Sequence, residues 1–89
     1  NNIYNYPNPF NPITKLRYHL TKDTFVKITV YDMLGNVVNN LLKTNQSSGK
    51  KSVQWNATDN FGHPVSAGVY LYQIETDNFT QTKKMLLLK

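Results

Sequence analysis

The sequence contains no cysteine. This absence excludes a disulfide scaffold, a thiolate-ligated metal site and a cysteine nucleophile. No apolar run approaches the ~18 residues that span a bilayer as a helix, so no transmembrane segment is expected. The chain starts at Asn1 with neither an initiator methionine nor a signal-peptide pattern, and we expect it to be a fragment or a processed piece of a longer protein.

Acidic residues are also scarce, with five against ten lysines and arginines and a net charge of +5. Most of the five lie at turn signals, where an Asp side chain caps its own backbone. The two histidines are isolated, and no nucleophile elbow, phosphate-binding loop or zinc-protease motif occurs. We therefore expect neither an enzyme nor a cofactor or metal site. The charge suits anionic partners, but without a block of like charges a basic surface is the simpler interpretation.

One acidic loop leaves an alternative open. In "DNFG" the side chains of Asp59 and Asn60 offer oxygen ligands that suit Ca²⁺. However, no second acidic residue follows at the spacing of a calcium-binding loop. A type I turn closed by Gly62 is therefore the favoured interpretation.

Apolar residues recur at every second position along most of the chain. This period of two is typical of half-buried antiparallel strands. The residues predicted to face a core are Leu16, Tyr18 and Leu20; Val26, Ile28 and Val30; Val53 and Trp55; and Tyr70, Tyr72 and Ile74. Turn signals separate these runs at a spacing of roughly 12–16 residues, which is typical of a β-sandwich.

Two segments are less regular. Residues 36–43, "NVVNNLLK", also fit a helical turn, but the adjacent asparagines favour a strand with a bulge that lets Val38 and Leu41 both point inward. The last segment, "TQTKKMLLLK", is predicted to be a strand with Met85 and Leu87 on one face and two further leucines on the other. An apolar run on both faces indicates a strand that is covered on two sides or that meets a partner.

These patterns predict an all-β fold, an immunoglobulin- or fibronectin-III-like antiparallel β-sandwich of about seven strands. The length fits a single domain over residues 1–89, with residues 1–5 as the remnant of a linker.

The large aromatic side chains are predicted to form the core. Tyr18, Trp55, Tyr70 and Tyr72 lie on the inward faces, so core packing is favoured over a platform that binds sugars. Nucleic-acid binding is not expected, because no face is predicted to combine exposed aromatic residues with basic ones.

The segment "YPNPFNP" holds three of the four prolines. Proline excludes a helix interior and a central strand and restricts each preceding residue. We predict that the segment packs at an edge of the sandwich, where missing donors cost little. Tyr6 and Phe10 are expected to be its anchors, with Phe10 at least partly buried.

Four ordered blocks, "YPNPFNPITKLRYHL", "VYDMLGNVV", "VQWNATDNFGHPVSAGVYLYQI" and a terminal "TKKMLLLK", resemble the type A C-terminal sorting domain of the type IX secretion system. The chain is also similar to the immunoglobulin-like domain of flagellar hook-capping proteins. The residues that match the sorting-domain motifs ahead of the terminal block are Tyr6, Pro7, Asn8, Pro9, Phe10, Tyr31, Gly35, Gly49, Trp55, Gly62, Gly68 and Tyr70. Two departures lie in turns: Asn56-Ala57 replaces an acidic residue and glycine, and Thr21 replaces a proline.

The resemblance implies a non-catalytic export signal at the C-terminus of a cargo protein. The implied partners are the cargo domain in the same precursor, the outer-membrane translocon, and its processing and attachment machinery. The implied location is the periplasm in transit, then the cell surface or the extracellular space.

The terminal strand is the expected site of translocon recognition. Its residues are Lys83, Lys84, Met85, Leu86, Leu87, Leu88 and Lys89. An apolar edge strand can pair with a partner strand, and the lysines add charge complementarity. The alternative function is a structural or adhesive immunoglobulin-like spacer or assembly module of a cell-surface or flagellar-hook-type protein.

Overall fold

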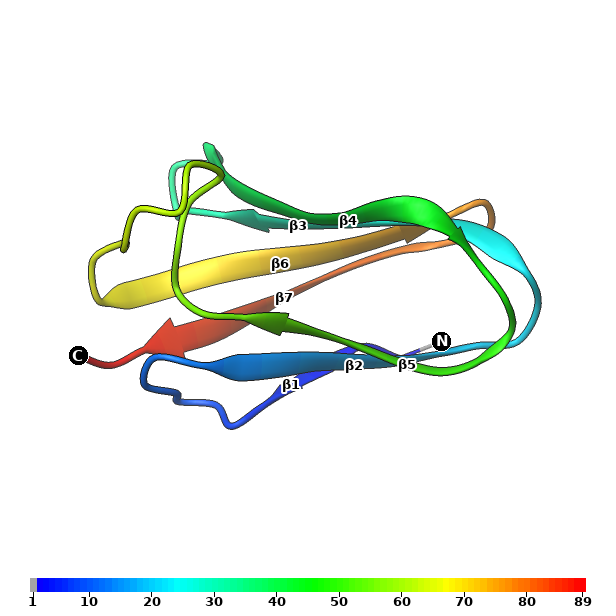
Figure 1. The fold of residues 1–89 in the computed structure, drawn as a ribbon, viewed down its shortest axis with the longest axis horizontal. Helices are drawn as coiled ribbons and strands as arrows, with labels where there is room; N and C mark the ends of the chain where they lie inside the picture. The colour runs from blue at the N-terminus through cyan, green and yellow to red at the C-terminus, as the bar shows by residue number, and fades with distance from the viewer. Residues whose placement is uncertain (1) are drawn as a thin grey trace.

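The computed structural model describes residues 2–89, which form seven strands in two antiparallel sheets (Figure 1). One sheet has the strand order β1-β2-β5, and the other has the order β4-β3-β6-β7. The strands are β1 (Tyr4–Tyr6), β2 (Thr14–Leu20), β3 (Thr24–Tyr31), β4 (Val37–Gln46), β5 (Gly49–Trp55), β6 (Gly68–Thr76) and β7 (Thr80–Leu87). The described residues include no helix that could cross a membrane. The predicted all-β sandwich is confirmed.

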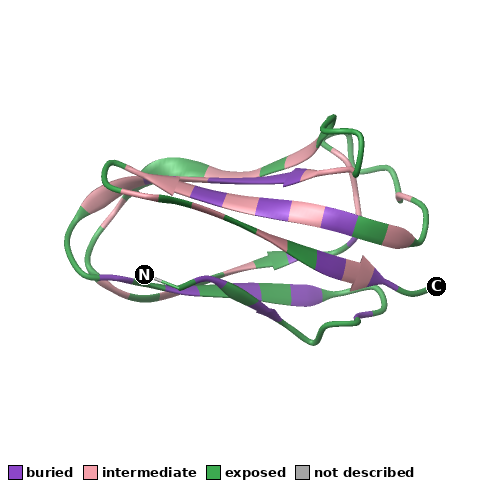
Figure 2. Ribbon diagram, turned by 180° about the vertical axis from the view of Figure 1, so that it is seen from behind, coloured by how far each residue is buried: buried purple, intermediate pink, exposed green. Residues whose placement is uncertain are grey.

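Side chains from both sheets meet in one core. Figure 2 shows buried and exposed residues alternating along the strands, as the period of two predicts. Every residue predicted to face the core is buried except Val53, which is partly buried. Burying one large aliphatic or aromatic side chain contributes about 1.5–3 kcal/mol, so the packing between the sheets is a main source of stability.

β4 follows its neighbour β3 with two interruptions. The pairing skips one residue of β4 at Leu41 and another at Val38. Both of these residues are partly buried and pack against the core. Each bulge places two residues of β4 opposite one of β3 and so redirects a side chain. The predicted bulged strand is confirmed, with two bulges where the sequence suggested one.

Two turns repeat the pattern Asp-x-x-Gly-x, at residues 32–36 and 59–63. In each turn the glycine N–H donates to the Asp carbonyl, at 3.1 and 3.0 Å, which is the closing bond of the predicted type I turn. Each glycine, Gly35 and Gly62, has a positive φ, 88° and 82°, which other residues seldom adopt.

The two turn carboxylates are held by their own backbones. In each turn the Asp Oδ1 accepts two backbone N–H groups at 2.9 Å. These bonds, led by the one from the last residue of the turn, lower the pKa of Asp32 and of Asp59. A lowered folded-state pKa means that the stabilisation is complete above the ordinary Asp pKa and is lost as the pH falls through the lowered value.

Hydrogen bonds join β4, at its adjacent asparagines, to the loop between β5 and β6. Asn60 N–H donates to the Val38 carbonyl at 3.0 Å, and Asn40 N–H donates to the Asn60 Oδ1 at 2.8 Å. The Asn39 side chain donates to the Asp59 carbonyl at 3.1 Å. The bulged edge of β4 is therefore paired with a loop where a neighbouring strand is missing.

Residues 3–6 are part of the sandwich, which differs from the linker remnant expected over residues 1–5. β1 is paired with β2 along its length. Ile3 is fully buried, and its N–H donates to the Gln81 Oε1 at 2.8 Å. Residues 4–6 can form a strand because the sequence "YNY" itself alternates with a period of two. Residue 1 lies outside the described part of the chain.

Thr29, which alternates with the core residues Ile28 and Val30 and so lies on the outer face of β3, offers a test of a buried polar group. Its Oγ1 is buried and has no hydrogen-bond partner within residues 2–89. An unpaired buried polar atom costs ~1–3 kcal/mol, and valine has nearly the same shape without the hydroxyl. Thr29→Val is expected to raise the free energy of unfolding by about 1 kcal/mol in urea denaturation. The matched change Thr44→Val, at an exposed position of β4, is expected to stay within about 0.5 kcal/mol of wild type. An unchanged or lower stability of Thr29→Val contradicts the prediction.

Candidate functional site

The segment Tyr6–Pro12, called the latch from here on, lies against the end of β7. Phe10 N–H donates to the Leu86 carbonyl at 3.0 Å, and Leu88 N–H donates to the Phe10 carbonyl at 2.8 Å. Phe10 thereby forms a parallel bridge with β7. The first and last motifs of the chain are thus in direct contact.

Asn8 extends this contact with its side chain. The Asn8 Oδ1 accepts the Leu86 N–H at 3.0 Å, and its Nδ2 donates to the Lys84 carbonyl at 3.5 Å. The outward-facing backbone groups at the end of β7 are therefore already hydrogen-bonded. A partner strand binds through such groups, so strand addition here requires that the latch first be displaced.

The Phe10 side chain anchors the latch. It is 2% exposed, and its ring centroid lies 5.8 Å from that of Trp55. Trp55 in turn meets the ring of Tyr70 edge-on at 5.4 Å, and its Nε1 donates to the Thr58 carbonyl at 2.8 Å. Aromatic pairs contribute ~0.5–1.5 kcal/mol beyond the area they bury. The predicted burial of Phe10 is confirmed.

Tyr6 is not an anchor, contrary to expectation, because it is 67% exposed. The alternation of β1 instead turns Asn5 inward. Its Nδ2 donates to the Thr14 Oγ1 at 3.2 Å, and that hydroxyl donates to the Pro7 carbonyl at 2.8 Å. A buried polar pair therefore fixes the start of the latch.

Other motif residues lie at the starts and ends of strands or in the core. Gly49 and Gly68 open β5 and β6 with φ values of 124° and 144°. Tyr31 is half-buried at the end of β3. Tyr70 is buried beside Trp55. The recognition site expected from the sequence is the terminal strand.

The side chains of the terminal run point in two directions. Met85 and Leu87 are buried in the core, as predicted. Lys84, Leu86 and Leu88 lie on the outer side, where Lys84 and Leu88 are exposed and Leu86 is half-buried.

β6 extends this outer surface. The register pairs Val69 with Leu86 and Leu71 with Lys84, and side chains of paired residues share one face of a sheet. We call Val69, Leu71, Lys84, Leu86 and Leu88 the terminal patch. It is apolar with one cation, and it combines the exposed part of the terminal motif with the start of β6.

The other two lysines of the terminal run lie apart from this patch. Lys83 is half-buried and is paired with Tyr72. Lys89 is exposed, and its ammonium group donates to the Val65 carbonyl. Within the terminal patch, the positive charge comes from Lys84.

The loop with the candidate cation ligands is a structural turn. The Asp59 Oδ1 accepts two backbone N–H groups, and the Asn60 Oδ1 accepts one from β4. The Asp59 Oδ2 lies 3.8 Å from the His63 Nδ1. No group of three or more acidic, histidine or cysteine side chains within residues 2–89 could hold a metal ion. The turn interpretation is confirmed.

The predicted aromatic core is confirmed, since Tyr18, Trp55, Tyr70 and Tyr72 are all buried. Burial raises the pKa of Tyr18, an effect that its hydrogen bond to Gln46 partly offsets, and burial also raises that of Tyr72. These four residues therefore offer no platform for sugars.

A different pair of tyrosines is exposed, however. Tyr4 and Tyr6 lie on the outer face of β1, and the register pairs them with Arg17 and Lys15. The expectation that no face combines exposed aromatic and basic residues is wrong. Tyr4 fell in the residues interpreted as a linker remnant, and Tyr6 was expected to be an anchor packed on the sandwich, so neither was predicted to be exposed beside a basic residue.

Three solved structures have a domain with a similar fold. PorU from Porphyromonas gingivalis, in its dimeric latent form, matches with a TM-score of 0.77 and 22% identity, over 97% of this chain and 9% of that chain. PorZ from the same species, described as an essential surface component of the type-IX secretion system, matches with a TM-score of 0.68 and 19% identity, over 98% of this chain and 11% of that chain. FlgD from P. aeruginosa matches with a TM-score of 0.64 and 26% identity, over 83% of this chain and 57% of that chain.

These likenesses show a shared sandwich, and the chain spans about a tenth of PorU and PorZ. No curated protein sequence matches the chain. A family model described as "Secretion system C-terminal sorting domain" matches residues 4–88, which is nearly the whole chain. The chain therefore belongs to the family of secretion-system C-terminal sorting domains, the export signals of the type IX secretion system.

Proposed function

We propose that the translocon recognises this sorting domain through the side chains of the terminal patch, with the backbone edge of β7 kept closed. The observation that carries the proposal is that the inward side chains, the backbone groups and the outward side chains at the end of β7 have three different environments. Its inward side chains complete the core, its outward backbone groups bond to the latch, and its outward side chains remain accessible. An exposed apolar patch rimmed by polar residues marks a site of protein–protein interaction.

The family assignment implies export to the cell surface or the extracellular space. We infer that a cargo domain precedes the chain in its precursor and that the precursor passes through the periplasm. The secretion machinery, including its processing and attachment components, is the proposed partner. The chain is proposed to act without catalysis, by presenting a folded surface.

Export of a fused reporter tests the proposal. Residues 1–89 are placed behind a reporter that reaches the periplasm, in a host with the type IX system. The double change Lys84→Glu and Leu88→Ser alters two exposed residues, so its stability is expected to stay within about 1 kcal/mol of wild type. The expected result is at least about tenfold less reporter outside the cell, which corresponds to about 1.4 kcal/mol of lost recognition.

The matched control changes a lysine and an aliphatic residue elsewhere on the same sheet, again to glutamate and serine. Lys43→Glu and Val37→Ser alter two exposed positions of β4 and are expected to leave export unchanged. Equal export by the terminal-patch variant and wild type, with equal thermal stability, refutes recognition through the patch. Failure of the wild-type fusion to leave the periplasm refutes the sorting function and favours an immunoglobulin-like spacer.

A further inference from the structure

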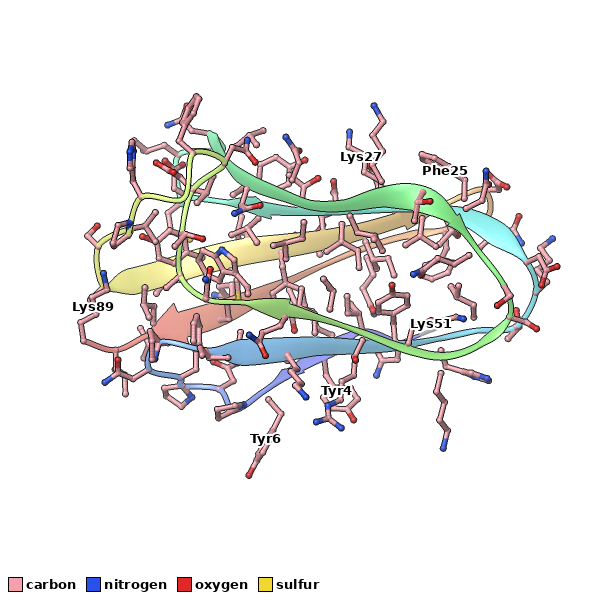
Figure 3. All side chains as sticks on the ribbon, in the orientation of Figure 1. Tyr4, Tyr6, Phe25, Lys27, Lys51 and Lys89 are labelled. Carbon is pink, nitrogen blue, oxygen red and sulfur yellow. The ribbon has the colours of Figure 1, made fainter. Side chains whose placement is uncertain are left out.

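The outer face of the β1-β2-β5 sheet carries an unassigned surface of tyrosines and cations. It lies on the opposite side of the sandwich from the terminal patch, which belongs to the other sheet. We call its outward-facing residues Tyr4, Tyr6, Lys15, Arg17, His19 and Lys50 the tyrosine–basic face. All six are exposed. Figure 3 shows Tyr4 and Tyr6 projecting below this sheet, whereas Lys27 projects above the other sheet, on the opposite side of the molecule.

The strand register arranges this surface in rows. Tyr6 is paired with Lys15, and Tyr4 with Arg17. On the next strand, His19 is paired with Lys50. Neighbouring strands lie ~4.8 Å apart, and residues two apart on one strand are ~7 Å apart. Each tyrosine therefore has a cation one strand away, and the rows repeat along the sheet.

The cations of this face are not neutralised by the protein. No acidic residue occurs in β1, β2 or β5. The ion pairs found within residues 2–89, Lys27–Glu75 and His63–Asp59, both lie outside this sheet. Charges of one sign on a shared surface raise the local concentration of oppositely charged ligands.

A shallow hollow adds shape to the charge. It has a volume of about 440 Å³, and its lining includes Asn2, Tyr4, Arg17, His19 and Lys50. Ser52 also lines the hollow, so neutral polar side chains lie beside the cations. The hollow thus brings the exposed ring of Tyr4 together with cations and hydrogen-bonding groups, and Tyr6 and Lys15 lie outside it.

We propose that this face binds an anionic polysaccharide whose sugar rings carry carboxylates. The apolar face of a pyranose ring can stack on each tyrosine, while its carboxylate pairs with the adjacent cation. In a uronic acid the carboxylate is bonded to the ring itself, which suits a cation only one strand from the aromatic ring. The ring hydroxyls can form hydrogen bonds with the side chains of Asn2 and Ser52.

Two other polyanions fit the face less well. In a nucleic acid a sugar separates the phosphate from the base that would stack, so ring and charge are further apart than the rows of the sheet. In an acidic polypeptide the carboxylates carry no ring to cover the tyrosines. Both are outcomes that the experiment below distinguishes.

Binding of residues 1–89 to alginate oligosaccharides, measured by titration calorimetry at low salt, tests the inference. Tyr4→Thr with Tyr6→Thr removes the rings, keeps every charge and retains residues that favour strands. Lys15→Gln with Arg17→Gln removes two charges at exposed positions. Each pair is expected to weaken binding at least about tenfold. The control pair Lys27→Gln with Lys43→Gln removes the same charge from the other sheet and is expected to stay within about twofold.

Binding of other polymers shows which class of ligand this face prefers. Neutral dextran is expected not to bind, and polyglutamate and oligo-deoxythymidine are expected to bind at least about tenfold more weakly than alginate. Equal loss in the control pair, full affinity after loss of both tyrosines, or tighter binding of either competitor overturns the proposal. The inference does not depend on the terminal patch, because all variants of this face are expected to be exported like wild type.

Discussion

Replacing Trp55 with alanine is expected to remove a large part of the domain's free energy of unfolding. The indole is 1% exposed and packs between Phe10 and Tyr70. Loss of a buried tryptophan typically costs ~3–5 kcal/mol, and the change also removes the donor to the Thr58 carbonyl. Domains of this size have a total stability of only about 5–10 kcal/mol. Urea denaturation followed by far-ultraviolet circular dichroism measures the effect.

The control Trp55→Phe separates packing from hydrogen bonding. It keeps an aromatic ring between the two neighbours but removes the Nε1 donor and part of the volume. We expect a smaller loss, about 1–3 kcal/mol, and a domain that remains folded. If the alanine variant denatures within about 1 kcal/mol of wild type, the aromatic cluster is not the centre of the core.

The faces of the strands were predictable from the sequence because burial follows a period of two. In β2, for example, Leu16, Tyr18 and Leu20 had to share a face whatever their partners were. The bulges of β4 were partly predictable for the same reason, since Val38 and Leu41 break the alternation. Local pattern therefore gave the fold class and most of the core.

Which elements become neighbours was not predictable in the same way. The contact of Phe10 with the end of β7 joins residues at opposite ends of the chain, and no local signal records it. The exposed face of β1 was missed because a three-residue strand beside a chain end has too short a pattern to exclude a linker. The closed edge of β7 depends on the first of these features, and the tyrosine–basic face depends on the second.

A departure from the family pattern places a side chain in the left-handed backbone region. Ala57 has a φ of 60°, in the left-handed region where a side chain costs roughly 1–2 kcal/mol. Glycine, which the resemblance implies at this place, avoids that cost. Ala57 is buried, and burial of its methyl group returns about 0.8 kcal/mol. Burial of the methyl group therefore offsets part of the cost of this backbone conformation.

Replacing Phe10 with alanine is expected to open the latch as well as destabilise the fold. The buried ring is lost from its contact with Trp55, at a cost of about 3–5 kcal/mol in the free energy of unfolding. The exposed neighbour in the same motif provides the matched control. Tyr6→Ala is expected to change the stability by about 0.5 kcal/mol or less.

Amide hydrogen exchange distinguishes latch opening from global unfolding. In wild type the Leu86 N–H donates to Asn8 and the Leu88 N–H donates to Phe10, so both should be protected. In Phe10→Ala we expect these two amides to exchange faster by a larger factor than the core amide of Val30, because local opening adds to global unfolding. An opened latch also exposes an edge strand that can pair with a second copy, so self-association that rises with concentration is expected. If all three amides accelerate by one common factor and the variant stays monomeric, the latch is not a separate unit and the edge of β7 is never exposed without unfolding.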